Sequence, residues 1–117
     1  ADVEPGDIDL AEVHDCFSIN EAVQIEDLGL VPRGQGIEAS VEGRTTLDGD
    51  IPINTDGGLK SKGHPVGATG AGMFTEVWKQ VRGEVDGKRQ VPDAEIGLSS
   101  NIGGSGASAA TIVLERL

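Results

Sequence analysis

The sequence predicts a mixed α/β domain in which helices pack against a β-sheet. Three observations point to this fold class. Apolar runs of strand length lie near both ends of the chain, apolar residues recur at helical spacing in two other stretches, and glycine-rich turns separate these segments. The 117 residues suffice for one small domain with a single core. Glycine, at 18 residues, clusters in loops rather than in a repeat, so the chain is expected to fold.

The first predicted strand is the short apolar run 10–13, which ends at His14. A helix is expected over 17–28, where apolar residues recur at helical spacing, and Gly29 is a plausible stop for it. His14 and Cys16 therefore lie at a strand-to-helix turn. Active residues of α/β proteins often lie at such carboxyl ends of strands.

A long segment over 31–56 follows, in which glycine and proline interrupt any regular period. Ile51 and Ile53 are expected to form a short extended piece near its end. A loop of this length in a compact domain is usually functional or packed on a neighbouring part.

The glycine-rich stretch 57–72 precedes the second predicted helix, which runs to about Arg82 and stops at Gly83. His64 lies at the junction, and Pro65 fits the first helical turn, where no backbone N–H is needed. Such a junction offers free N–H groups and the positive end of a helix dipole, which suit an anionic ligand or a developing oxyanion. The alternative is a glycine loop that only lets the helix pack closely on a sheet, with a merely buried histidine.

The end of the chain predicts a β-hairpin after a charged, turn-rich connector over 84–93. Two buried strands are expected at 94–99 and 107–114, joined by a glycine turn over 101–106. Together with the first half, this gives three strands and two helices. The sheet is short of strands for a complete domain.

The chain is strongly acidic, with a formal net charge of −11 from 20 Asp and Glu against 9 Lys and Arg. This balance argues against a nucleic-acid or anionic-membrane partner. Cys16 is the single cysteine, which excludes an internal disulfide and fits a reducing compartment, so a cytoplasmic location is expected. No apolar run approaches the length of a membrane span. The start lacks an initiating Met and a signal-peptide pattern, which suggests a fragment, a processed chain or an isolated domain.

Three motifs, in this order, resemble those of thiolases, the enzymes that make or cleave 3-ketoacyl-CoA thioesters. The tetrapeptide His-Asp-Cys-Phe at 14–17 stands where most thiolases read Asn-Glu-Ala-Phe, and it is similar to the sterol-carrier-protein-type and archaeal branch. From Gly57 the chain reads Gly-Gly-x-x-x-x-Gly-His-Pro-x-Gly-Ala-Thr-Gly. The loop 101–106 stands where thiolases carry a Cys-x-Gly motif. The resemblance extends over about 9–117, and three ordered motifs are more specific than any one alone.

The resemblance implies that residues 1–117 form an incomplete thiolase C-terminal domain, whose full sheet would have five strands. It further implies that an N-terminal half, absent here, carries the nucleophilic cysteine, and that the complete protein is a homo-oligomer. The implied function is acyl transfer of the acetyl-CoA acetyltransferase type, by Claisen condensation or by thiolytic cleavage of 3-ketoacyl-CoA. This chain alone is expected to be inactive. Coenzyme A thioesters are then substrates, and neither a cofactor nor a metal is expected.

Two alternatives stay open beside the thiolase interpretation. A thiolase-like aldolase, acting on a CoA-linked side chain, would keep the scaffold but lack the acylated cysteine. A non-catalytic subunit would bind acyl-CoA without turnover. In each case the acidic chain is poorly suited to bind anionic coenzyme A. The positive groups that bind coenzyme A would therefore come from elsewhere in the protein.

Claisen condensation of thioesters needs a thiolate that takes up the acyl group, a base for the α-proton and two oxyanion holes. By the resemblance, Cys16 is the candidate acid/base, because members with His-Asp-Cys-Phe use the cysteine of that motif. Asn101 stands at the position of the usual acid/base cysteine and cannot shuttle a proton as a thiol can. Without the resemblance, Cys16 would be taken for a small buried apolar residue.

The two histidines are candidates for nucleophile activation and oxyanion binding. The resemblance implies that His64 helps to activate the absent nucleophilic cysteine and donates to a thioester oxygen. His14 matches the asparagine that holds a water in that oxyanion hole, and we expect it to donate there directly or through water. The alternative for His14 is a histidine that only caps a strand end.

Gly103 and Asp15 are further candidates, whereas two polar loop residues are not. Gly103 matches the glycine of Cys-x-Gly, whose N–H lines the second oxyanion hole and whose lack of a side chain lets the backbone approach the substrate. Asp15 is expected to orient His14 or the loop, or else to cap the following helix. Asn54 and Ser61 have the character of ordinary loop residues.

Overall fold

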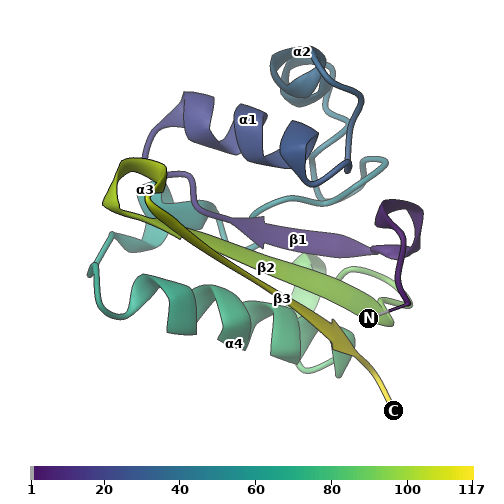
Figure 1. The fold of residues 1–117 in the computed structure, drawn as a ribbon. Helices are drawn as coiled ribbons and strands as arrows, with labels where there is room; N and C mark the ends of the chain where they lie inside the picture. Colours follow the sequence, from purple (N-terminus) through teal and green to yellow (C-terminus); the bar gives the residue numbers. More distant parts are fainter. Residues whose placement is uncertain (1) are drawn as a thin grey trace.

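A computed structural model describes residues 2–117 and shows a three-stranded sheet with helices on both faces (Figure 1). Strand β1 (Leu10–Val13) runs parallel to β2 (Ile96–Gly103), which runs antiparallel to β3 (Ser108–Glu115). The order β1-β2-β3 places β2 in the centre. The predicted α/β class, a mixed sheet with packed helices, is therefore confirmed.

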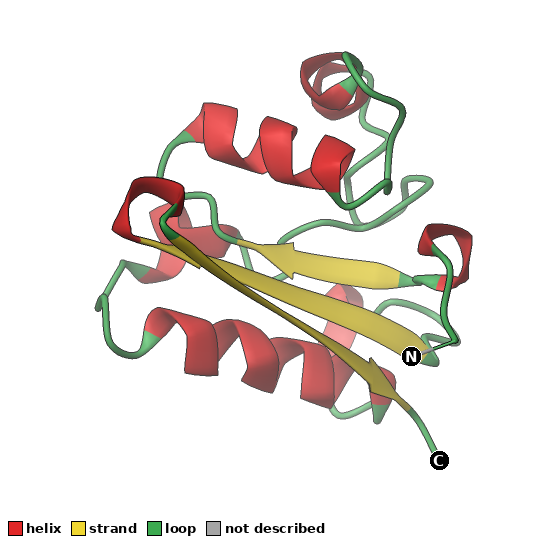
Figure 2. Cartoon of the chain, viewed as in Figure 1, coloured by secondary structure: helices red, strands yellow, loops and turns green. Residues whose placement is uncertain are grey.

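The helices form two layers around this sheet. On one side lie α1 (Ser18–Asp27) and α2 (Gly36–Val41), and on the other lies α4 (Thr69–Val81), as Figure 1 shows. The short α3 (Gly58–Lys62) precedes α4, and Figure 2 shows the long loops, in green, that join these elements. Three single 3₁₀ turns complete the regular structure, at Pro5–Asp7, Gly87–Arg89 and Gly104–Gly106.

Side-chain alternation along β1 divides the core into two parts, because successive residues of a strand point to opposite faces. Leu10 packs with Val77 and Val81 of α4. Ala11 and Val13 belong to the cluster on the opposite face, under α1. All four residues of β1 are buried, so this short strand is covered on both sides.

Close packing of α4 on the sheet depends on Gly97 of β2. A Cβ at this position would lie 2.5 Å from Cγ1 of Val77, well inside a normal contact. The absence of a side chain therefore sets the spacing between the helix and the strand. This spacing in turn places the first turn of α4 near the carboxyl ends of β1 and β2.

The long segment predicted as loop over 31–56 contains regular structure. Ile53 forms an isolated parallel bridge with Ala11 beside β1, which confirms the expected extended piece at Ile53, whereas Ile51 lies in a bend. The prediction missed α2, because a six-residue helix that starts at a glycine is too short to show an apolar period.

The second predicted helix begins later than expected. The sequence placed Pro65 in its first turn, but α4 starts at Thr69, so Pro65 lies outside it and that prediction is wrong. Residues 58–62 form α3 instead, between left-handed glycines at Gly57 and Gly63. His64 is exposed, which contradicts the alternative of a merely buried histidine.

The C-terminal hairpin is confirmed with shifted bounds. β2 continues to Gly103, so Asn101 lies within the strand and the tight turn is Gly104–Gly106. The strand predicted as buried over 107–114 is mostly exposed, because β3 is the last strand of the described sheet. Among the helices described for residues 2–117, none combines the length and apolar character that crossing a bilayer requires.

Candidate active site

His14 lies at the carboxyl end of β1, and its backbone is held on two sides. Its N–H donates to the carbonyl of Ser100 at 3.1 Å and to Oε1 of Gln24 at 3.3 Å. Its carbonyl accepts from Nε2 of Gln24 at 2.7 Å. The strand end is thus fixed by β2 and by a buried amide of α1, so the direction of the imidazole is set by the fold.

The structure brings the two predicted histidines together. The ring centroids of His14 and His64 lie 5.0 Å apart, with the rings edge to face at 84°. His14 is buried at 6% exposure, whereas His64 is exposed and comes from the segment between α3 and α4. Residues 50 positions apart therefore form one pair at the end of the sheet.

Both rings are hydrogen-bonded through Nδ1. The Nδ1–H of His14 donates to Oδ1 of Asn101 at 2.6 Å, since an amide oxygen can only accept. The Nδ1 of His64 lies 2.7 Å from Oγ1 of Thr69, whose hydroxyl donates to the carbonyl of Pro65 at 3.2 Å. Because that hydroxyl has one hydrogen, His64 Nδ1–H is the donor to Thr69.

These bonds define what the Nε2 atoms can do. Within the described residues 2–117, neither His14 nor His64 has a hydrogen-bond partner at Nε2. A neutral ring with its proton on Nδ1 presents a lone pair at Nε2, which accepts a proton or a hydrogen bond. Direct donation to an oxyanion from Nε2 requires the imidazolium form, whereas a water can bridge the neutral ring to the oxyanion.

Cys16 lies just before α1 and is partly buried. Nδ2 of Asn20 lies 3.5 Å from its Sγ and also donates to the carbonyl of His14 at 3.2 Å. One amide of α1 therefore holds the thiol and the His14 backbone together. The thiol therefore has a hydrogen-bond donor at Sγ and lies beside the N-terminus of a ten-residue helix.

Asp15 anchors the segment that leads to His64. Its Oδ1 accepts from the backbone N–H of Leu59, and its Oδ2 lies so close to Gly58 that a Cβ there would come within 2.2 Å. The helix-cap interpretation of Asp15 is wrong, because the N-cap of α1 is Phe17 and no side chain caps it. Orientation of the loop, the other expectation, agrees with this contact.

Gly103 lies at the carboxyl end of β2, pairs with Ser108 and has extended backbone angles. Because β1 and β2 are parallel, Gly103 and His14 lie at the same edge of the sheet. Within residues 2–117, Gly103 makes no hydrogen bond to His14, His64 or Cys16. The oxyanion role of its N–H stays a prediction.

Sequence reasoning missed several residues that build the site. Asn54, taken for an ordinary loop residue, accepts at Oδ1 from the N–H of Val13 and donates at Nδ2 to Glu21 of α1, both at 2.9 Å. Asn54 has a positive φ of 52°. The dipeptide Asn54-Thr55 gives no sign of this backbone conformation in the sequence. Gln24 and Thr69 carried no signal beyond their polar character at buried positions.

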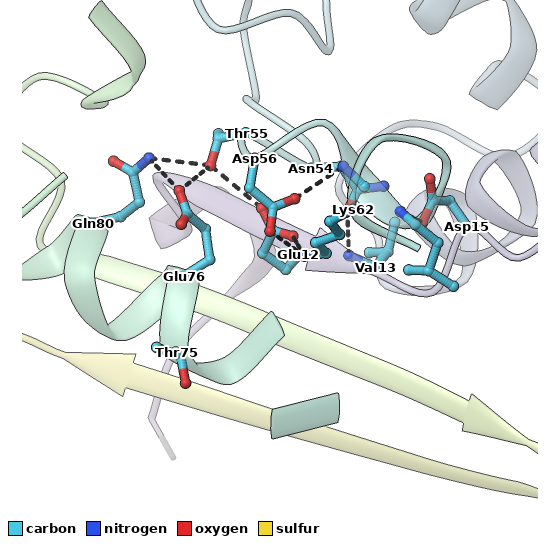
Figure 3. Close-up of polar contacts among 12 residues, drawn as sticks. Glu12, Val13, Asp15, Asn54, Thr55, Asp56, Lys62, Thr75, Glu76 and Gln80 are labelled. Carbon is cyan, nitrogen blue, oxygen red and sulfur yellow. Dashed lines mark hydrogen bonds and ion pairs between the residues drawn. The ribbon is translucent and has the colours of Figure 1, made fainter. Parts of the chain in front are cut away.

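A buried polar network lies between β1 and α4 (Figure 3). Glu12 of β1 is fully buried, and its Oε1 accepts from the hydroxyl of Thr55 at 3.3 Å. Lys62 lies 3.6 Å from Oε2 of Glu12 and forms a closer ion pair with Asp56. Glu76 of α4 joins the network through Thr55, Gln80 and Arg89.

Burial, together with the nearby carboxylate of Asp56, raises the pKa of Glu12 to about 8. The ammonium of Lys62 opposes this rise without offsetting it, because Lys62 is engaged mainly with Asp56. This raised pKa favours the protonated form of Glu12 at neutral pH, which weakens its 3.6 Å contact with Lys62 as an ion pair. Lys62, two residues before His64, is then paired with Asp56.

The best-defined groove of the described chain lies elsewhere, between α1 and α2. It has a volume of about 450 Å³ and shares Asp15 with the site, but neither histidine lines it. Its apolar walls come from Ile19, Ala22, Ile37 and Val41, with Lys60 at one side. Among residues 2–117, no group of three His, Cys, Asp or Glu side chains could hold a metal ion.

Comparison with known proteins gives relatives in which the region similar to this chain is a minor part of the length. It is 57% identical to an acetyl-CoA acetyltransferase of Methanothermobacter thermautotrophicus over 99% of this chain and 30% of the relative. It is 51% identical to sterol carrier protein 2 of Homo sapiens over 92% of this chain and 20% of the relative. The chain thus spans less than a third of the length of these curated relatives.

A solved structure titled Ltp2-ChsH2(DUF35) aldolase has the same fold, with a TM-score of 0.79 and 26% identity. The match covers 98% of this chain and 29% of that chain. A family model described as thiolase C-terminal domain-like matches residues 1–116. The motifs, the fold and this match over almost the whole sequence agree, and the chain belongs to the thiolase C-terminal domain-like family.

Proposed function

We propose that this chain is the C-terminal catalytic part of a thiolase of the acetyl-CoA acetyltransferase type. The observation that carries the proposal is the pair of His14 and His64, 5.0 Å apart, with Nε2 of each ring unbound within the described residues. Cys16 lies two positions after His14 and shares the Asn20 amide with it. The 57% identity to a protein named acetyl-CoA acetyltransferase supports the reaction class.

In the proposed reaction, His64 serves the first half. A cysteine outside this chain gives its S–H proton to Nε2 of His64, where the bond from Nδ1 to Thr69 leaves a lone pair. The resulting thiolate attacks the carbonyl carbon of an acyl-CoA. The C–S bond to coenzyme A breaks, and the leaving coenzyme A thiolate takes the proton from His64.

Cys16 serves the second half. As a thiolate it removes the α-proton of a second acyl-CoA, and the enolate carbon attacks the carbonyl of the acyl-enzyme. A carbon–carbon bond forms, and the acylated cysteine leaves as a thiolate. In the cleavage direction, the S–H of Cys16 protonates the enolate that departs.

His14 and Gly103 would stabilise negative oxygen in these steps. His14 reaches a thioester oxygen through a bridging water when its ring is neutral and directly when it is protonated. The N–H of Gly103 would line the second oxyanion hole, at the same edge of the sheet. The strongly acidic chain requires that basic groups outside it bind the phosphates of coenzyme A.

The similarity to a structure titled as an aldolase favours a second candidate, a thiolase-like aldolase that acts on a CoA-linked side chain. Such an enzyme would use the same histidines without an acylated cysteine. The two candidates differ in one observable, the covalent acyl-enzyme. A non-catalytic subunit would bind acyl-CoA and give neither reaction.

The test uses the full-length protein that contains this chain. Under the proposal, a short pulse of acetyl-CoA adds one acetyl group to the intact mass, and acetoacetyl-CoA with coenzyme A yields acetyl-CoA. The 117-residue chain alone should give neither result, because Cys16 cannot be acyl carrier and proton shuttle in the same step. Turnover by this chain alone would overturn the assignment of roles. Carbon–carbon cleavage without an acyl-enzyme would favour the aldolase.

A further inference from the structure

We propose that Asn101 is the positioning residue for His14, a role that rests on the proposed function of the histidine pair. Asn101 lies within β2, three residues before the hairpin turn, and its Oδ1 accepts from Nδ1–H of His14 at 2.6 Å. The bond joins the carboxyl ends of two parallel strands. It fixes the plane of the imidazole and leaves Nε2 for the substrate side.

The chemical nature of the partner matters as much as its place. An amide oxygen holds the Nδ1–H tautomer without adding a charge, so Nε2 of the neutral ring keeps its lone pair. A carboxylate at 101 would keep the acceptor but favour the imidazolium. An alanine at 101 would leave the ring free to turn and to exchange tautomers. Asn101 therefore selects one of several states that His14 could adopt.

A second observation shows that the helix accommodates this amide. A Cβ on Gly70, in the first turn of α4, would lie 2.9 Å from Nδ2 of Asn101. Gly70 has no unusual positive φ, so its backbone does not itself require glycine. The missing side chain instead leaves room for the Asn101 amide beside His14.

The chain offers a matched pair of variants for this contact. Gly70→Ala and Gly72→Ala make the same change in the same helix, but a Cβ on Gly72 meets nothing within 4 Å. Both substitutions favour the helix by propensity. Only Gly70→Ala pushes the Asn101 amide, so only it should disturb His14.

The test uses the full-length protein with ¹⁵N-labelled histidine. The ring ¹⁵N shifts of His14 should report the neutral Nδ1–H tautomer in the unmodified protein. In Asn101→Asp, which keeps the acceptor but adds a negative charge, they should move toward those of the doubly protonated imidazolium. Asn101→Ala and Gly70→Ala should give mixed tautomers, while Gly72→Ala should not. An unchanged Nδ1–H signal in Asn101→Ala would overturn the proposal. This readout does not depend on activity, so it decides the role of Asn101 even if the protein is no thiolase.

Steady-state rates of the same variants give a second, independent test of the role of Asn101. Asn101→Ala and Gly70→Ala should lower kcat for condensation about ten- to a hundredfold. Acetyl transfer to the enzyme, which depends on His64, should stay within about twofold, and so should KM. Ser100→Ala, next to Asn101 on β2, removes a hydroxyl contact to Thr111 of β3 and is the control for strand damage. Loss of acylation together with condensation would indicate general disruption and contradict a positioning role. An unmodified protein that forms no acyl-enzyme would instead contradict the proposed function.

Discussion

Asp15 and Leu59, 44 positions apart, are joined by a buried hydrogen bond of 2.9 Å from the backbone N–H of Leu59 to Oδ1 of Asp15. This bond ties the end of β1 to the segment that leads to His64. Gly58 lies against the same carboxylate and has room for it only because it lacks a Cβ. The position of His64 relative to His14 therefore depends on Asp15.

Asp15→Ala should lower the free energy of unfolding by about 1–3 kcal/mol, because the buried N–H of Leu59 loses its acceptor. In the full-length protein it should also slow acylation, since the segment before His64 is no longer anchored. Denaturant unfolding and an acetyl-CoA pulse measure the two effects. Asp27→Ala is the control, as Asp27 forms only an exposed ion pair with Arg33. If both variants unfold at the same denaturant concentration, Asp15 does not anchor the segment.

Glu12 predicts a specific dependence of stability on pH. Its pKa rises from 4.5 to about 8 on folding, so the folded chain holds this proton more tightly than the unfolded chain. The contribution of Glu12 is most favourable below pH 4.5, declines as pH rises to about 8, and is constant above it. The decline is on the order of a few kcal/mol, since each pKa unit corresponds to about 1.4 kcal/mol.

Glu12→Gln should remove this decline, because an amide does not ionise. We expect its unfolding free energy to vary less between about pH 5 and pH 8 than that of the unmodified chain, and to exceed it near pH 8. Urea unfolding at several pH values measures this. Glu38→Gln, at an exposed position of α2, serves as the comparison. Parallel pH curves for the Glu12 variant and the unmodified chain would show that Glu12 is ionised when folded.

Cys16→Ala and His64→Ala should fail at different steps in the full-length protein. Cys16→Ala should still be acylated by acetyl-CoA and then stall before the carbon–carbon bond forms. His64→Ala should be acylated slowly from the start. A positioned acid/base contributes about a hundred- to ten-thousandfold in rate. The intact mass after a short pulse of acetyl-CoA separates the two variants. Near-normal condensation by Cys16→Ala would mean that another group is the acid/base, and His14 is the next candidate.

The exposed strand β3 predicts association of the isolated chain. Ile112 of β3 is 45% exposed on the last strand of the described sheet, and an uncovered strand edge tends to pair with another chain. Light scattering after size exclusion should show concentration-dependent self-association, and Ile112→Lys should reduce it. A monomer that stays stable on dilution and binds no apolar dye would count against this expectation.

The sequence predicted the succession of strands and main helices along the chain, because these segments have clear apolar periods. It also predicted that His14, Cys16 and His64 belong to one site, which depended on motif resemblance rather than on periodicity. In the structure the two histidine rings lie 5.0 Å apart, and the amide of Asn20 contacts both the Cys16 thiol and the His14 carbonyl. Their catalytic roles stay predictions.

The rest could not be predicted, because it depends on contacts between distant residues. Nothing in the run around Asn101 indicates a bond to an imidazole 87 positions earlier. Nothing in the apolar run 10–13 indicates that its one charged residue, Glu12, is buried on the side of the sheet that α4 covers. The exposure of β3 depends on which strands are present, and local sequence does not encode that.

Three structural requirements apply to the residue at position 54, which contacts the end of β1. Its φ of 52° restricts the choice to glycine and to the short side chains that tolerate a left-handed backbone. The N–H of Val13 needs an acceptor there, and the carboxylate of Glu21 needs a donor. Glycine offers neither group, aspartate offers only acceptors, and glutamine has the wrong length for the turn. Of these four residues only asparagine meets all three requirements, so a residue that looks interchangeable in the sequence has a specific role in the fold.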